Sequence, residues 1–275
     1  VIFGVNLKEY GPSEVEIYLS ETFDFCVAFF GALAIGVRPI LLAKPIFSSD
    51  KFNINDENFK NFLTPARNIE PKFDINSTFF LQTSGSTGNS KNIPKRLGAM
   101  IEEGLFLKEE LGFNESDTFF SSVSHQHMFG LTFKVFLPII SGAKAVSKEL
   151  NYPEAIFELD LSNLSFITSP VLLQTLISSP RAAEISGLKN IICAGSVLKS
   201  ELRASIAKLS SARIIDIYGS TETGVVARNL GDELLLFSKV KAGLSEDEAL
   251  NVSSPWCEFF QTSDWAQIDG NRLTL

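Results

Sequence analysis

The stretch Leu81–Lys95 reads LQTSGSTGNSKNIPK and leads from an apolar, β-like run into a loop of glycine, serine and threonine. Glycines allow a backbone to approach a ligand closely and to adopt positive φ angles. Successive N–H groups and hydroxyls in such a loop form a concavity suited to phosphate oxygens, and the ammonium of Lys91 adds a positive charge. A flexible surface loop has the same composition, so composition alone leaves both interpretations open. The candidate phosphate-binding residues are Thr83, Ser84, Gly85, Ser86, Thr87, Gly88 and Lys91.

The loop does not form the Walker A pattern Gly-x4-Gly-Lys-Ser/Thr, which leads into a helix. Ser90 stands where that pattern has its second glycine, and Asn92 follows Lys91. Ile93 is β-branched and Pro94 lacks an N–H group, so a strand or turn is expected after the lysine. Phosphate would therefore be bound by a different architecture.

Around this loop, short apolar runs alternate with segments whose apolar residues recur at helical spacing. Strands are expected at Val37–Ala43, Ser77–Gln82, Asp117–Val123, Ser165–Thr168, Asn190–Ala194 and Arg213–Tyr218. Helices are expected at Thr22–Gly36, Leu97–Leu111, Phe129–Ile140, Val171–Ser178 and Ser200–Leu209. The alternation predicts a layered α/β body with largely parallel sheets. The polar, Asn-rich segment Asp50–Asn61 is expected to be a surface loop or a short exposed helix.

The pattern changes near Gly231, after which β-rich runs and short turns dominate. Strands are expected there at Leu234–Phe237, Glu258–Thr262 and Arg272–Leu275. We therefore expect two units, an α/β core over residues 1–230 and a small β-rich subdomain over residues 231–275.

Composition argues against several classes of function. The 275-residue chain carries 32 acidic and 24 basic residues, a net charge of −8, and no dense Lys/Arg stretch that would bind nucleic acid. Its longest apolar run, Phe25–Val37, has 13 residues, whereas a helix needs about 20 to span a bilayer. No charged-then-apolar segment opens the sequence, so no secretion signal is expected. Cys26, Cys193 and Cys257 are far apart and odd in number, which indicates reduced thiols and a cytoplasmic protein.

The stretch Thr83–Lys91 resembles the phosphate loop of the adenylate-forming superfamily, which comprises acyl-CoA synthetases, adenylation domains of peptide synthetases and luciferases. The pattern of that family is Thr/Ser-Ser-Gly-Thr/Ser-Thr-Gly-x-Pro-Lys, and this sequence departs from it at Ser90, where the family has proline. Four further segments follow in the family's order, so the resemblance covers most of the chain. It implies the N-terminal core domain of an AMP-dependent acyl synthetase.

The first of these segments is His125–Gly130, HQHMFG, which resembles the His-x-x-Gly motif beside the acyl pocket of the family. Two histidines at i and i+2 would also suit metal ligands or a general base, but no third histidine completes a zinc site. By the resemblance His127 is the matching histidine, while His125 is expected to be a hydrogen-bonded core residue. The acid-pocket residues implied are His127, Phe129, Ala194, Gly195 and Ser220.

The segment Ile217–Gly224, IYGSTETG, matches the family's Tyr-Gly-x-Thr-Glu motif fully. The resemblance implies that Tyr218 stacks on adenine, that Thr221 contacts the α-phosphate and that Glu222 holds Mg²⁺. A carboxylate together with phosphate oxygens suits that hard cation. Taken alone, the segment is equally consistent with a turn whose Thr and Glu cap a helix.

Two weaker segments complete the series. Ala194-Gly195-Ser196 resembles the turn that lies against adenine, and Gln261–Asp264 resembles the Thr-Gly-Asp motif, whose aspartate bonds the ribose, with Ser263 in place of glycine. Asp269-Gly270 resembles the hairpin turn that follows in the family. Asp216 stands where relatives often carry an Asn that bonds the adenine amino group. The AMP-binding residues implied are Gly195, Ser196, Asp216, Tyr218, Gly219, Thr221 and Asp264.

The resemblance implies ATP-dependent activation of a carboxylic acid, fatty or aromatic, to an acyl-adenylate. The acyl group then passes to the thiol of CoA or of a carrier protein's phosphopantetheine. Family members continue beyond the Asp-Gly hairpin with a hinge and a small C-terminal lid domain that supplies a lysine for adenylation. The chain is therefore expected to be a truncated N-terminal domain that binds nucleotide and acid but is poorly active alone. A degenerate nucleotide-binding or scaffold module is the alternative. A serine hydrolase would need a Gly-x-Ser-x-Gly elbow, and neither Gly85-Ser86 nor Gly219-Ser220 fits that pattern.

Overall fold

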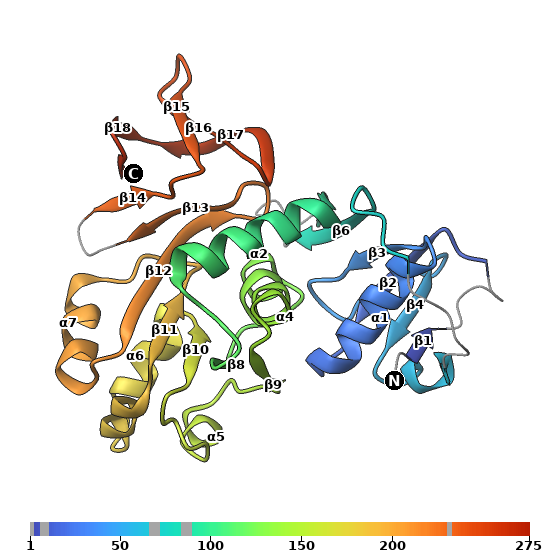
Figure 1. Ribbon diagram of the computed structural model, residues 1–275, viewed down its shortest axis with the longest axis horizontal. Helices are drawn as coiled ribbons and strands as arrows, with labels where there is room; N and C mark the ends of the chain where they lie inside the picture. The colour runs from blue at the N-terminus through green and yellow to red at the C-terminus, as the bar shows by residue number, and fades with distance from the viewer. Residues whose placement is uncertain (1–2, 6–10, 66–71, 84–89, 230–232) are drawn as a thin grey trace.

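Figure 1 shows the computed structural model of the chain, which describes residues 3–5, 11–65, 72–83, 90–229 and 233–275. Two large β-sheets with helices between and around them form the body, and a three-stranded sheet stands at one end. This arrangement confirms the predicted α/β body with largely parallel sheets.

The larger sheet has nine strands within the described ranges, in the order β18-β19-β14-β13-β12-β11-β10-β8-β9. Its parallel strands are β8 (Thr118–Ser121), β9 (Lys144–Glu149), β10 (Ser165–Thr168), β11 (Asn190–Cys193) and β12 (Arg213–Ser220). Its antiparallel strands are β13 (Gly224–Asn229), β14 (Leu234–Leu236), β18 (Gln267–Asp269) and β19 (Arg272–Thr274). Every residue of β10 and β11 is buried, as expected for parallel strands covered on both faces.

The smaller sheet has the strand order β4-β2-β3-β6-β7. Its strands are β2 (Glu14–Tyr18), β3 (Arg38–Leu41), β4 (Phe52–Asn55), β6 (Thr78–Thr83) and β7 (Lys91–Arg96). The first four are parallel, and β7 runs antiparallel to β6 at the edge of the sheet. An edge strand accommodates Pro94, which cannot donate to a ladder. The segment after Lys91 is therefore a strand.

The C-terminal segment contributes to two sheets. Strands β14, β18 and β19 extend the nine-stranded sheet, whereas β15 (Lys241–Leu244), β16 (Ala249–Ser254) and β17 (Cys257–Trp265) form the three-stranded one. Near the N-terminus, β1 (Phe3–Val5) pairs with β5 (Leu63–Pro65). The division into units at residues 1–230 and 231–275 remains a prediction.

Helix α2 (Leu97–Leu111) lies between the two large sheets and packs against both. Leu97 and Met100 belong to the apolar core of the smaller sheet, while Phe106 and Leu107 belong to that of the larger sheet. A third core lies beneath α6 and α7 on the other face of the larger sheet. The other helices are α1 (Thr22–Ala34), α3 (Met128–Gly130), a π-helix (Leu131–Phe136), α4 (Leu137–Ser141), α5 (Pro153–Ile156), α6 (Pro170–Ile177), α7 (Ser200–Leu209) and 3₁₀ turns at Phe59–Phe62 and Ala182–Gly187.

Most predicted elements lie where expected. Helices α2 and α7 have the predicted bounds, and α2 ends directly before Gly112. The helical run predicted at Phe129–Ile140 consists of α3, the π-helix and α4 in succession. Strands β2, β9 and β13 had no counterpart in the prediction, because Glu, Lys or Arg side chains interrupt their apolar pattern.

The prediction for Asp50–Asn61 is wrong. This segment contains β4 and most of a 3₁₀ turn, and it buries Ile54 and Phe59. Its asparagines satisfy one another: the Asn58 amide donates to Asn53 Oδ1 at 3.2 Å. Local polar bonds of this kind allow an Asn-rich segment to pack against the sheet rather than face solvent.

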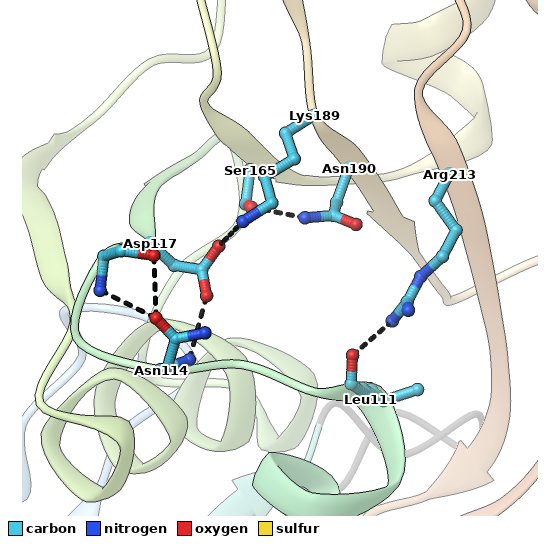
Figure 2. A network of polar contacts seen from close by, with 8 residues as sticks. Leu111, Asn114, Asp117, Ser165, Lys189, Asn190 and Arg213 are labelled. Carbon is cyan, nitrogen blue, oxygen red and sulfur yellow. Dashed lines mark hydrogen bonds and ion pairs between the residues drawn. The ribbon is translucent and has the colours of Figure 1, made fainter.

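The amino ends of the parallel strands form a network of polar contacts (Figure 2). Asp117 is buried directly before β8, and its Oδ1 accepts from Lys189 Nζ at 2.6 Å. Across the neighbouring strands, Asn190 Nδ2 donates to Ser165 Oγ at 2.9 Å. Arg213 Nη2 donates at 2.7 Å to the carbonyl oxygen of the last residue of α2, where helices leave carbonyl groups without an internal partner.

None of the helices in the described ranges combines the length and the apolar character that a bilayer span needs. All three cysteines lie in described segments and are unpaired, with Cys193 and Cys257 buried.

Candidate active site

A cleft of about 1000 Å³ opens beside the carboxyl ends of β11 and β12. Ligands of open α/β sheets bind outside these strand ends. The loop from β11 to α7, the end of β12, the end of β17 and the C-terminal strand β19 all contribute to its walls.

Six of the seven residues predicted to bind AMP line this one cleft. They come from three stretches that are distant in sequence, so it is the fold that brings them together. The lining residues of this set are Gly195, Ser196, Asp216, Tyr218, Gly219 and Asp264. Thr221 lies just beyond, on the turn between β12 and β13.

Tyr218 and Asp264 connect β12 to β17. The Tyr218 hydroxyl donates to Asp264 Oδ2 at 2.6 Å. Burial, reinforced by this carboxylate, raises the pKa of Tyr218, so the phenol remains a proton donor. Thr262 Oγ1 accepts from the Asp264 N–H at 3.1 Å. Asp264 is thus oriented through both its side chain and its backbone, although Ser263 replaces the glycine of the family motif.

Asp216 is buried at the cleft and is 3% exposed. Its Oδ1 accepts a hydrogen bond from the Cys193 thiol at 3.6 Å, and its Oδ2 lies 3.5 Å from Arg203 Nη2. Burial raises the pKa of Asp216, and the guanidinium of Arg203 opposes that rise. The Asn229 side chain and the Leu198 N–H also hydrogen-bond to this carboxylate, so protein groups already meet much of its capacity of about four lone pairs.

The turn between β12 and β13 carries Thr221 and Glu222. It is a hairpin turn rather than the start of a helix, so the helix-capping interpretation is wrong. Ser220 Oγ accepts from the Glu222 N–H at 3.2 Å, and Thr223 Oγ1 accepts from the Ser220 N–H at 3.0 Å. These side-chain bonds give the turn a defined shape.

The base of this turn requires glycine at position 219. A Cβ atom on Gly219 would lie 2.1 Å from the carbonyl oxygen of Gly224, closer than side chains permit. The register of β12 against β13 also shifts between Tyr218 and Gly219. A bulge of this kind turns a strand locally, and here it separates the cleft-lining Tyr218 from the turn.

Glu222 is the residue predicted to hold a magnesium ion. Its side chain is half-buried, while its backbone N–H and carbonyl are bonded to Ser220 Oγ and Lys95 Nζ. Mg²⁺ commonly takes one or two protein carboxylates and completes its shell with phosphate oxygens and water. One carboxylate on a fixed backbone fits that requirement.

The predicted phosphate-binding residues lie partly outside the described residues. Thr83 ends β6 and Lys91 begins β7 directly opposite, with Thr83 Oγ1 donating to the Lys91 carbonyl at 3.4 Å. The Lys91 side chain is exposed. The predicted residues outside the described ranges are Ser84, Gly85, Ser86, Thr87 and Gly88.

The predicted acid-pocket residues are more dispersed. His127 is exposed directly before α3, and the Phe129 ring lies 5.1 Å from that of Phe133. Ala194 and Ser220 adjoin cleft-lining residues in sequence but do not line the cleft themselves. Of this set, Gly195 is a lining residue.

His125 is a core residue, as predicted. It is 1% exposed; its Nε2 lies 2.9 Å from the Leu19 carbonyl oxygen and its Nδ1 lies 3.1 Å from Thr22 Oγ1. Burial lowers the pKa of His125 to about 3, so the ring is neutral at physiological pH.

Sequence reasoning missed two apolar residues of the cleft. Trp265 and Val197 are each 76% exposed and line the cleft next to Asp264 and Ser196. Their positions beside motif residues were the available signal, because large exposed apolar side chains often mark binding sites.

The chain matches a protein family described as AMP-binding enzyme over residues 40–245. Among curated proteins it is similar to tyrocidine synthase 3 of Brevibacillus parabrevis, at 25% identity over 169 residues. That alignment covers 60% of this chain and 3% of the relative, so the chain spans only a small part of that protein's length.

Solved structures show the same fold. The ATP-bound crystal structure of MatB from Rhodopseudomonas palustris superposes with a TM-score of 0.83 at 14% identity, covering 97% of this chain and 69% of that one. A benzoate CoA ligase from Burkholderia xenovorans gives a TM-score of 0.84 at 16% identity, covering 98% and 71%. Since the family match extends over well more than half of its residues, the chain belongs to the AMP-binding enzyme family, as its resemblance to adenylate-forming proteins implies.

Proposed function

We propose that the protein uses ATP to activate a carboxylic acid as an acyl-adenylate, and that a thiol then takes the acyl group. The observation that carries this proposal is the convergence of Gly195, Asp216, Tyr218 and Asp264 on one cleft, with the Glu222 turn directly beyond it. These groups offer an aromatic ring, acceptors for an amino group and for hydroxyls, and a carboxylate for a cation, which are the groups that a magnesium-bound nucleotide needs.

Each residue has one task in the proposed reaction. Tyr218 stacks on adenine, Asp216 accepts from the adenine amino group, and Asp264 accepts from the ribose hydroxyls. Thr221 contacts the α-phosphate and Glu222 holds Mg²⁺, which neutralises phosphate charge when bound. Lys91 and the loop before it hold the outer phosphates. The acid's carboxylate attacks the α-phosphorus and pyrophosphate leaves, so catalysis consists of positioning and charge stabilisation.

The acid is fatty or aromatic in this proposal. His127 and Phe129 border it, and the neighbouring Phe133 makes these surroundings apolar. The benzoate CoA ligase of similar fold is named for an aromatic acid. The acceptor is the thiol of CoA or of a carrier protein's phosphopantetheine. Unpaired cysteines fit the reducing cytoplasm.

Binding of adenylate to the 275-residue chain tests the proposal directly. A non-hydrolysable acyl-adenylate analogue should raise its melting temperature, since a ligand that binds the folded state stabilises it. An unchanged melting temperature with AMP, Mg·ATP and the analogue would count against nucleotide binding.

The metal role has its own test. Glu222→Gln keeps the size of the side chain and removes its charge, so Mg·ATP binding should weaken by about tenfold while adenosine binding stays the same. Isothermal titration with each ligand measures the difference. An unaltered affinity for Mg·ATP would contradict the role. Binding of nucleotide without exchange of pyrophosphate into ATP would favour a degenerate binding module.

A further inference from the structure

Two charged side chains lie buried beneath the turn that connects β12 and β13. Lys95 of β7 is 7% exposed and Glu103 of α2 is 1% exposed, and neither lines the cleft. We propose that Lys95 and Glu103 are positioning residues, which hold this turn from below and fix where its Glu222 carboxylate lies. This inference rests on the proposed function, because that function gives the position of Glu222 its importance.

Glu103 links the end of the turn to the π-helix, because each of its carboxylate oxygens binds one of these two elements. Its Oε1 accepts from the Val225 N–H at 2.7 Å, and its Oε2 accepts from the Thr132 hydroxyl at 3.0 Å. Gly224 admits this contact: its φ is +67°, and a Cβ there would lie 2.4 Å from Glu103 Oε1. Trp256 Nε1 donates to the Val225 carbonyl at 3.2 Å. Side chains therefore bind both backbone groups of the residue that leaves the turn.

Lys95 holds the middle of the turn. Its Nζ donates to the Glu222 carbonyl oxygen at 3.0 Å. Because Lys95 belongs to the smaller sheet and the turn belongs to the larger one, this bond joins the two sheets. Lys91 and Lys95 are four positions apart in one strand, so their side chains leave the same face. The strand that begins with the predicted phosphate-binding lysine thus also binds the main chain of the predicted magnesium ligand.

The charges of the pair explain why both side chains are needed. Burial lowers the pKa of Lys95 and raises that of Glu103, while the attraction between the two groups opposes both shifts. Apolar side chains fill buried space at lower cost than two opposite charges, whereas removing one charge leaves the other uncompensated. Charged groups also make the contact with the turn specific, because the ammonium requires an acceptor and the carboxylate requires a donor.

Comparison of two ligands with two buried-pair variants tests this role. In Lys95→Met, Mg·ATP should bind about tenfold more weakly, and adenosine, which needs only the cleft, should bind within about twofold of the original affinity. Glu103→Gln should show a smaller change of the same kind, because its amide oxygen can still accept from Val225. Lys189→Met is the matched control: it breaks a lysine–carboxylate contact at the opposite end of the larger sheet and should leave the ratio of the two affinities unchanged.

Amide hydrogen exchange provides a readout that does not depend on nucleotide. Peptides covering residues 221–225 should exchange faster in Lys95→Met but not in Lys189→Met. If the ratio of affinities and this exchange both match the parent chain in Lys95→Met and Glu103→Gln, the pair serves stability alone and the inference is overturned. If the parent chain binds neither ligand, the proposed function fails, and the exchange arm still decides whether Lys95 holds the turn. Should Lys95→Met not fold, Glu103→Gln carries both measurements.

Discussion

The parallel strands of the larger sheet carry polar residues at both ends, and the two ends use them in opposite ways. At the amino end, Asp117 and Lys189 bind each other, and Asn190 binds Ser165 (Figure 2). At the carboxyl end, Tyr218 and other polar residues line a cleft of about 1000 Å³. We call the amino end closed, because its polar groups bind one another, and the carboxyl end open, because its polar groups line a cleft.

The difference shows what distinguishes a candidate site from a structural network. Buried polar groups normally find partners within the protein, and the contacts of Asp117 with Lys189 and with the Asn114 N–H meet that demand. Asp264 also has a protein partner, yet it is exposed and faces a cavity. Polar residues occur at both ends of the strands, so polarity alone does not identify a binding site. An acceptor that faces a cavity does indicate one.

The largest effect is expected at the open end, where Asp264→Ala should weaken AMP binding by about 100-fold. The variant loses the carboxylate proposed to accept from the ribose and leaves the Tyr218 hydroxyl without its partner. Because Asp264 is exposed, the free energy of unfolding should change by less than about 1 kcal/mol. Isothermal titration and urea unfolding measure the two quantities. Asp269→Ala, in the exposed β18–β19 hairpin, is the control. If Asp264→Ala binds AMP within about twofold of the parent affinity, Asp264 does not belong to the site.

The closed end should respond in the opposite sense. Asp117→Ala should lower the free energy of unfolding by about 2 kcal/mol, since Lys189 and the Asn114 N–H lose their buried acceptor and the half-exposed lysine is partly screened by water. AMP affinity should stay within about twofold. Urea unfolding checks the stability, with the exposed neighbour Glu115→Ala as control. A loss of AMP affinity in the still-folded variant would break the distinction between the two ends.

The sequence predicted the open end better than the closed one. Motif residues such as Tyr218 and Asp264 could be singled out because they match a family pattern, and the structure places both at one cleft. Asp117 and Asn190 form contacts between strands that are distant in sequence, and a single sequence gives no signal for such pairs. The fold class followed from the alternation of apolar runs, which depends only on local periodicity.

Local periodicity also explains the errors. The polar appearance of Asp50–Asn61 concealed β4, whose asparagines bond to one another while Ile54 packs inward. Lys95 and Glu103 were missed because charged residues are expected at the surface. Their partners come from segments distant in sequence: the Glu222 carbonyl binds Lys95, and the Val225 N–H and the Thr132 hydroxyl bind Glu103.

A smaller effect is expected from Tyr218→Phe, which sharpens the comparison within the open end. The ring remains for stacking, and only the bond that orients Asp264 is lost, so AMP should bind about fivefold more weakly, equivalent to ~1 kcal/mol. Titration with AMP measures the loss. Tyr152→Phe, a distant and exposed position, is the control. An effect as large as that of Asp264→Ala would mean that the hydroxyl itself contacts the nucleotide.

The smallest expected effect is on how stability depends on pH, and it concerns Asp216, a buried carboxylate at the open end. Burial raises its pKa above the ordinary value of 3.8, so folding favours the protonated form. The stability that this group contributes is therefore fully present below pH 3.8 and is lost as the pH rises through the higher folded value. Asp216→Asn does not titrate, so its free energy of unfolding relative to the parent should be higher at about pH 7 than at about pH 4.

Urea unfolding of the two chains at both pH values measures this difference, and Asp264→Asn is the matched control because its exposed carboxylate lies in the same cleft. A relative stability of Asp216→Asn that falls as the pH rises would show that Arg203 outweighs burial and that the carboxylate is stabilised in its charged form. In that case Asp216 would resemble Asp117, as part of a satisfied ion pair. The open end would then contain structural as well as candidate binding residues, and position at the cleft alone would not separate the two.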